Sequence, residues 1–265
     1  MFLTEKYPLP YSSKIIKAGA LLSDTKMMLA SWDVNLTASE NLERFKKQNV
    51  FGKASRVRIG DMLAIFKQRY LVTEETTRAL VVLLNGQLPT EALNRIFYFY
   101  AAQSDALLHD TVTEMLSEFK RLGRHEITTA DVQSKLTRWM EEGKTAGHWS
   151  EPTTARIAQG LLATLRDFGV LTGAVRKRIA FMYLPPEAFS YIAFCLHQNQ
   201  PSGERLIHDP EWQLFFLDGE MVEKLFLEAH QRRLLEYHAA GPVIRMEFPT
   251  NSLEEYARVI TERSH

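Results

Sequence analysis

The sequence predicts a mainly α-helical protein of two helical lobes, the second resembling a winged helix-turn-helix with a small β-hairpin or sheet. Two observations lead to this fold class. Apolar side chains recur at helical spacing along most of the chain, as in residues 56–70, where four are spaced four, three and four residues apart. Within residues 129–184, two helical patterns precede two short apolar strands joined by a tight turn.

The first half of the chain is expected to be helical, with loops at polar and Gly/Pro positions. Thr37 and Thr73 are N-cap candidates, Pro89 suits a first helical turn, and residues 50–52 interrupt the pattern. The helices expected here are residues 14–32, 37–48, 56–70, 73–85, 89–103 and 105–122.

The second half contains the expected strands. Thr128 and Asp131 resemble a capping box, and the turn at Thr172-Gly173 joins strand 170–171 to strand 175–184. Strand 175–184 is also expected to pair with strand 243–248. The other expected elements are helices over 128–142, 150–168 and 186–198, a short helix capped by Asp209-Pro210, and helices over 218–240 and from 252 onward.

A polar stretch at residues 121–130 separates the two halves. It predicts a domain boundary, with an N-terminal helical domain at 1–125 and a winged-helix-like and C-terminal helical domain at 126–265.

Composition indicates a soluble protein of a reducing compartment. The 265 residues include a single cysteine, Cys195, which cannot form an internal disulfide. The chain starts without a signal-peptide pattern, and its longest apolar runs fall far below the ~20 residues of a membrane span. We therefore expect a cytoplasmic protein with no membrane partner.

Charge is balanced overall but unevenly distributed. The formal net charge is zero, yet residues 1–100 carry 14 basic and nine acidic side chains, whereas residues 184–265 carry seven and 13. The excess of basic side chains is largest at residues 44–69, which contain eight basic side chains and one acidic side chain. Such a layout can present one basic surface to a polyanion.

Motifs for catalysis are weak. The sequence contains neither the G-x-G-x-x-G loop of dinucleotide-binding proteins nor the G-x-x-x-x-G-K-[ST] loop that binds nucleoside triphosphates. The spacing Ser-x-x-Lys occurs twice, but without the Ser-Asp-Asn or Lys-Thr-Gly motifs that accompany a catalytic serine of this kind. Asp131 and Glu142-x-Lys144 resemble a metal nuclease, but a helix of about 16 Å separates the carboxylates. His230 and His238 lie two turns apart on one expected helix, too far to share an ion without other ligands. We therefore expect no catalytic residue, metal or cofactor.

The helix over 150–168 is the first candidate for contact with nucleic acid. Ile157, Leu161, Leu165 and Phe168 form its apolar stripe, while Arg156, Gln159 and Arg166 project from the other side. Arginine and glutamine can pair bidentately with guanine and adenine edges. An ordinary solvated face is the alternative, and the long loop before the helix counts against a helix-turn-helix.

Two basic segments complete the candidate interface. Arg176, Lys177 and Arg178 lie at the hairpin. They are interpreted either as contacts to phosphate or as charges that keep an edge strand from pairing with other chains. In the 44–69 segment the basic side chains flank an apolar stripe on both sides. This arrangement fits equally well with aliphatic stems that cover the apolar surface while the charged groups stay in water, without contact to nucleic acid. The candidate DNA-binding residues are Lys46, Lys47, Lys53, Arg56, Arg58, Arg156, Gln159, Arg166, Arg176, Lys177 and Arg178.

Several longer stretches carry a family resemblance. They are YSSK (11–14) to GALL (19–22), RIGDMLAIFKQRYL (58–71), FGVLTG (168–173) into FMYLPPEAFSYIAFCLH (181–197), and AAGPVIRMEFPTNSLEEYA (239–257). In these the chain resembles the small A components of bacteriophage-exclusion (BREX) defence systems, the BrxA family. None of the stretches is a catalytic motif.

The resemblance implies a mainly helical, non-enzymatic, DNA-binding protein likened to the RNA-binding antitermination factor NusB, with other defence components as partners. We therefore expect a double-stranded DNA-binding accessory protein with little sequence preference. The alternatives are a NusB-like RNA-binding factor and an assembly adaptor without affinity for nucleic acid. The acidic last third would face a protein partner.

Overall fold

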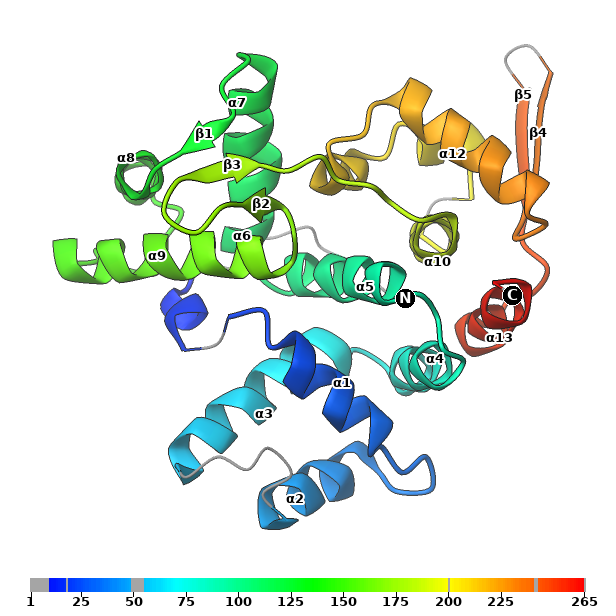
Figure 1. Cartoon of the computed structure of the whole chain (residues 1–265), viewed down its shortest axis with the longest axis horizontal. Coiled ribbons are helices and arrows are strands. Elements are labelled where there is room, and N and C mark those ends of the chain that lie inside the picture. Colours follow the sequence, from blue (N-terminus) through cyan, green and yellow to red (C-terminus); the bar gives the residue numbers. More distant parts are fainter. Residues whose placement is uncertain (1–9, 18, 49–54, 200, 241–242, 265) are drawn as a thin grey trace.

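Helices form most of the chain, and the computed structural model describes residues 10–17, 19–48, 55–199, 201–240 and 243–264 (Figure 1). Up to residue 121 the described elements are η1 (Ser13–Ile16), α1 (Leu22–Ala30), α2 (Ala38–Gln48), α3 (Arg56–Tyr70), α4 (Glu74–Asn85), α5 (Thr90–Gln103), α6 (Ala106–Asp110), the π-helical stretch η2 (Thr111–Leu116) and α7 (Ser117–Arg121). Five of the six helices expected here start and end within about two residues of the expected bounds.

The second half mixes helices with two small antiparallel sheets. Its elements are β1 (Glu126–Ile127), α8 (Thr129–Glu141), α9 (Glu151–Asp167), β2 (Leu171–Thr172), β3 (Lys177–Ile179), α10 (Pro186–His197), α11 (Gly203–Ile207), η3 (Pro210–Phe215), α12 (Gly219–Gln231), β4 (Glu236–Ala240), β5 (Val243–Glu247) and α13 (Leu253–Arg263). One sheet has the order β1-β3-β2 and the other pairs β4 with β5. The predicted fold class, mainly α with small antiparallel sheets, is confirmed.

Capping side chains set several helix starts where the sequence indicates them. Thr73 accepts from the backbone N–H of Thr76 at the start of α4. Thr128 and Asp131 form the predicted capping box at α8, with each side chain bonded to the other's backbone N–H. These caps satisfy N–H groups that have no partner within the helix.

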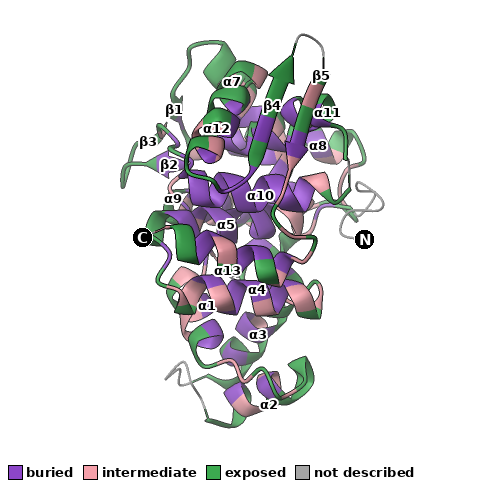
Figure 2. Ribbon diagram, turned by 90° about the vertical axis from the view of Figure 1, so that its right-hand side faces the viewer, coloured by how far each residue is buried: buried purple, intermediate pink, exposed green. Residues whose placement is uncertain are grey.

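The core crosses the expected domain boundary. α5 packs against α10 and α4 packs against α13, so helices from either side of residue 125 share one hydrophobic cluster. Figure 2 shows α5 and α10 at the centre of the molecule, with most of their residues buried. The division at 125/126 falls in the turn between α7 and β1 and stays a prediction.

The predicted helix over 218–240 is wrong in its second half. α12 ends at Gln231, and the N–H groups of Arg233 and Leu234 donate to the carbonyls of His230 (2.8 Å) and Ala229 (2.9 Å). This cap stops the helix because Arg233 takes a left-handed φ of 59°. The chain then forms β4 of a protruding two-stranded ribbon (Figure 1).

Two further expectations differ from the structure. Residues 14–32 do not form one helix, since Leu21 at φ 53° separates η1 from α1. The expected pairing between strands 175–184 and 243–248 is also wrong. β3 pairs with β1 and β2, while β5 pairs with the neighbouring β4, which lies two residues away in sequence and so closes with little loss of entropy. His230 and His238 therefore lie on α12 and β4, with ring centroids 5.6 Å apart.

The N-terminal segment fastens the long loop between α8 and α9. The Tyr11 N–H donates to the Lys144 carbonyl at 2.7 Å, and its hydroxyl donates to Asp110 at 2.5 Å. Its ring meets Trp139 edge-on, with centroids 5.1 Å apart. These contacts hold a loop longer than the usual tight turn in a defined position.

Within the described ranges, no helix combines the length and apolar character needed to cross a bilayer.

Candidate nucleic-acid interface

The candidate interface is a unit of strand, two helices and a hairpin. β1 precedes α8, α9 follows and packs against α8, and β2 and β3 form the hairpin. β3 is the central strand, with Lys177 opposite Ile127 and Arg178 between Glu126 and Thr172. β1 is not among the strands expected from the sequence, because two residues are too few to show alternation.

α9 has the two faces that its spacing predicts. Ile157, Leu161 and Leu165 are fully buried, and Phe168 is 2% exposed. The opposite side is open to solvent and carries Arg156, Gln159 and Arg166. The buried face is wider than expected, because η1 packs along one flank, where Gly160 lies against the Ile15 carbonyl.

A groove of about 460 Å³ lies between α9 and the hairpin turn. α9 contributes Gln159 and Arg166, and the turn contributes Val175 and Arg176. Val175 is 95% exposed at the tip of the turn. Glu126 also lines the groove, and Arg166 forms an ion pair with Asp167 at 2.7 Å, so the local positive charge is partly offset.

Lys177 does not belong to the exposed surface, contrary to the sequence expectation. Its side chain folds under the turn, where its ammonium donates to the carbonyls of Gly173, at 2.8 Å, and Ala174. The residue is only 8% exposed, whereas Arg176 and Arg178 on either side are exposed. Alternation along an extended chain is the physical reason, since neighbouring side chains point to opposite faces.

The basic segment 44–69 does not form one surface. Lys46 and Lys47 are exposed at the end of α2, with Lys46 3.9 Å from Glu43. Lys53 lies outside the described residues.

At the start of α3, Arg56 is exposed, while Arg58 donates to the Lys17 carbonyl. Arg69 is buried and donates to the carbonyls of Gly19 (2.9 Å) and Ala20 (3.3 Å). The guanidinium groups of Arg58 and Arg69 thus serve to hold the N-terminal segment.

η1 connects the two basic regions. It lies between α9 and α3 (Figure 1) and packs against α9. Exposed Lys14 and Lys17 point to α3, 3.3 Å from Gln68 and from Asp61 respectively. Neither lysine is among the candidates from the sequence, because only the folded chain places residues 13–17 between these helices.

Asp131, Glu142 and Lys144, the residues that resemble a metal nuclease, each bond to different partners. Hydrogen bonds from Thr128 and Arg124 outweigh the effect of burial and lower the pKa of Asp131. Glu142 pairs with Arg138 at 2.9 Å, and Lys144 pairs with Glu114 at 2.9 Å. Across the described ranges, His, Cys, Asp and Glu side chains do not gather in threes in a way that would hold a metal ion.

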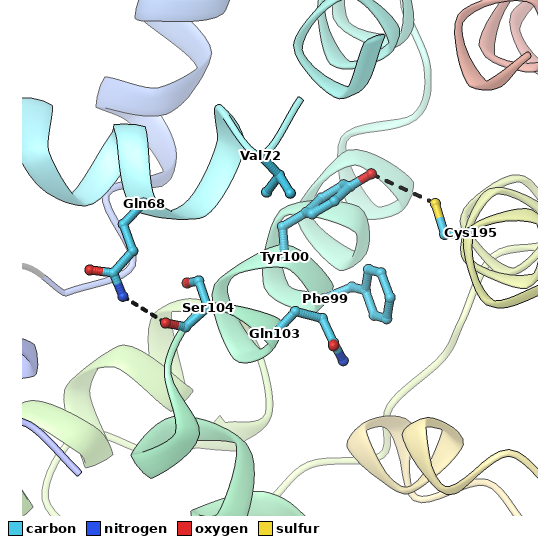
Figure 3. Close-up of a pocket in the computed structure, with 7 residues that line it drawn as sticks. All are labelled: Gln68, Val72, Phe99, Tyr100, Gln103, Ser104 and Cys195. Carbon is cyan, nitrogen blue, oxygen red and sulfur yellow. Dashed lines mark hydrogen bonds between the residues drawn. The ribbon is translucent and has the colours of Figure 1, made fainter. Parts of the chain in front are cut away.

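A smaller, mainly apolar cavity of about 210 Å³ lies between α3, α5 and α10 (Figure 3). The Tyr100 hydroxyl is 2.9 Å from that of Tyr191 and 3.7 Å from the Cys195 Sγ. Burial raises the pKa of the Cys195 thiol to about 12. The thiol is therefore protonated at neutral pH and is not a nucleophile.

Comparison with known families identifies the class of protein. The family model BrxA matches residues 9–195, about 70% of the chain, including η1, α3, α9 and the hairpin. The chain therefore belongs to the BrxA family, the A components of BREX phage-defence systems. Its match ends within α10, so the elements from α11 to α13 lie beyond it. No curated protein matches the chain.

Proposed function

We propose that this protein binds double-stranded DNA with little sequence preference, as a non-catalytic accessory protein of a BREX defence system in the cytoplasm. One observation carries the proposal: the groove between α9 and the hairpin turn places Gln159, Arg166 and Arg176 along one opening. In winged helix-turn-helix proteins the second helix enters the major groove, and the hairpin contacts the flanking backbone. The order β1, α8, α9, β2, β3 and the sheet order β1-β3-β2 are consistent with such a domain and support the proposal.

The charges favour backbone contact over base reading. Arg156, Arg166, Arg176 and Arg178 are all exposed, and each arginine that neutralises a phosphate releases condensed counterions. Gln159 is the exposed side chain of the α9 face best suited to an adenine edge. A single such contact provides modest discrimination between sequences, which agrees with binding that is governed by phosphate contacts.

η1 extends the proposed surface toward α3. Lys14 and Lys17 on this turn are exposed and reach Gln68 and Asp61 of α3, and Lys17 forms an ion pair with Asp61 at 3.3 Å. A duplex that extends from α9 over η1 would meet Lys14 as a further cation.

The test is fluorescence anisotropy with a labelled DNA duplex, and RNA of the same sequence, across a salt series. We expect duplex binding that weakens steeply with salt. The double variant Arg176→Ala/Arg178→Ala should flatten the log–log slope by about 1.8, since each phosphate contact contributes about 0.9. The matched control Arg205→Ala/Lys224→Ala removes the same charge from exposed positions on α11 and α12, and it should leave the slope unchanged.

Other outcomes would overturn the proposal. Preference for RNA would select a NusB-like role. Absence of binding to either nucleic acid at about 50 mM salt, where phosphate contacts are strong, would select an assembly adaptor. An equal effect of the control variant would show a response to net charge alone.

A further inference from the structure

A second pocket lies far from α9, at the base of the β4–β5 ribbon. Its volume is about 480 Å³, and it is enclosed by the end of α12, the ribbon and the end of α13. Three of its lining residues carry N–H donors: His230, Arg233 and Arg263. Its other walls include the apolar side chains of Leu235, Phe248 and Pro249. All of these residues lie beyond the part of the chain that matches the BrxA family.

The two arginines stand out from the other cations of this region. Residues 184–265 carry seven basic and 13 acidic side chains. Four of the seven basic side chains pair with a glutamate: Lys224, Arg232, Arg245 and Arg258. Arg233 and Arg263 have no ion pair with any described residue, and both line this pocket. Two unpaired cations converge here although the region as a whole is acidic.

The two guanidinium groups outnumber the acidic charge that is left in the pocket. Glu247 pairs with Arg245 on the same strand, which offsets its charge. The Glu236 carboxylate lies 3.6 Å from the Nε2 of His238, a contact that offsets its charge only when the ring is protonated. Two arginines therefore face one uncompensated carboxylate, and the pocket has a net positive charge. Like charges that share a pocket repel each other, and an anion between them removes that repulsion.

Backbone geometry holds the donors in place. Arg233 takes the left-handed φ of 59° that ends α12, a position where glycine is usual. The Arg263 Nη1 donates to the Arg233 carbonyl, which anchors the second guanidinium at the same corner. The His230 Nδ1 accepts the Tyr237 N–H at 3.3 Å, so the neutral ring carries its proton on Nε2.

We propose that this pocket binds a phosphate-bearing small molecule of the nucleotide class. The planar guanidinium fork matches two oxygens of a phosphate group, and two such forks suit a doubly charged anion. The apolar walls formed by Leu235, Phe248 and Pro249 cover the organic part of the ligand. The volume lies within the roughly 300–1,000 Å³ of small-molecule sites, whereas a lone phosphate ion leaves most of it empty.

Isothermal titration calorimetry of the full-length protein tests the site with ADP, adenosine and inorganic phosphate as probes. We expect ADP to bind more tightly than inorganic phosphate, and adenosine not to bind. Arg233→Gly removes one guanidinium and also relieves the left-handed strain. Its melting temperature should match or exceed that of the wild type, while its ADP affinity falls roughly tenfold or more, as loss of a charged hydrogen bond implies. Arg263→Ala should weaken ADP binding to a similar degree.

Arg205→Ala is the control, because Arg205 on α11 is exposed and has no ion pair with a described residue but does not line the pocket. The control should bind ADP as the wild type does. Absence of ADP binding to the wild type would overturn the proposal. So would equal affinity in the wild type and Arg233→Gly, or inorganic phosphate binding as tightly as ADP. DNA affinity should be the same in all these variants, which separates this site from the α9 surface.

Discussion

The buried guanidinium of Arg95 joins α5 to the end of α9, since its Nη1 donates to the Phe168 carbonyl at 3.0 Å. The same group donates through Nε to the Tyr183 carbonyl at 3.0 Å and pairs with Glu91 at 3.2 Å. One arginine of the central core thus holds both the entrance and the exit of the hairpin. This contact is one of those that join the proposed DNA-binding unit to the rest of the molecule.

Arg95→Ala should therefore lower the free energy of unfolding by about 3 kcal/mol, because it leaves buried carbonyls without a donor. Urea denaturation measures the change. Arg95→Lys should not restore stability, since one ammonium cannot reproduce the fork between two chain segments. Arg78→Ala is the control, because its ion pair with Glu74 is exposed, and it should cost no more than about 0.5 kcal/mol. Equal losses in the two alanine variants would contradict the role given to Arg95.

Lys177 and Arg178 should behave oppositely although they are neighbours. Lys177→Met leaves the carbonyls of Gly173 and Ala174 without their donor, so stability should fall by about 1–2 kcal/mol. The salt dependence of DNA binding should stay unchanged. Arg178→Ala should change stability by less than about 0.5 kcal/mol and flatten the salt slope by about 0.9. A flattened slope for Lys177→Met in a salt titration would show that its ammonium reaches phosphate.

Substitution by alanine should have opposite effects at Gly173 and at Gly60. Gly173 has φ 90°, and an added Cβ would lie 2.0 Å from the Arg176 carbonyl oxygen. Gly173→Ala should therefore destabilise the protein by at least about 2 kcal/mol and disrupt the hairpin turn. Gly60 is in the middle of α3 with open space around it, so Gly60→Ala should stabilise by about 0.5–1 kcal/mol. Thermal unfolding of both variants checks the two signs, and a stable Gly173→Ala protein would rule out this turn geometry.

His109 should make the stability depend on pH. Burial by itself lowers the pKa of His109, but hydrogen bonds to Asp110 (2.8 Å) and Glu211 (3.2 Å), and their charges, raise it to about 9. The folded state therefore holds its proton more tightly than the unfolded state does. This contribution, up to about 3 kcal/mol, is fully present below pH ~6.5 and is lost as pH rises through 9.

Urea unfolding at intervals between pH 6 and 9.5 measures this dependence. His109→Gln should be less stable at neutral pH, because Glu211 stays buried opposite an uncharged amide, but it should lose the slope between pH 6.5 and 9. An unchanged slope in the variant would assign the titration to another group.

The sequence predicted correctly those features that depend on residues close together in the chain. The phases of α3 and α9 follow from apolar residues on one side of each helix, and Ile59 and Leu161 are buried as expected. The capping box of Thr128 and Asp131 is also local, since all its partners lie within three residues. The alternation at residues 176–178 already implied that one cation points away from the others, and the structure shows that it is Lys177.

Long-range contacts decided the rest. β1 has two residues and exists only because β3 lies beside it. The end of α12 depends on the left-handed conformation of Arg233, a residue with no propensity for it, and that conformation places Arg233 and Arg263 in one pocket. Arg58 and Arg69 counted as surface charge in the sequence, whereas in the fold they bind carbonyls of residues 17, 19 and 20.

The sequence by itself determined the helical class, most helix boundaries, the exposed face of α9 and the family resemblance, because periodicity and capping are properties of neighbouring residues. Only the tertiary structure decided which cations are available to a ligand. A basic side chain can donate to a backbone carbonyl as well as to a phosphate, and the packing of distant segments determines which of these it meets. Lys177 and Arg95 thus hold the fold, while Arg176 and Arg178 remain on the surface.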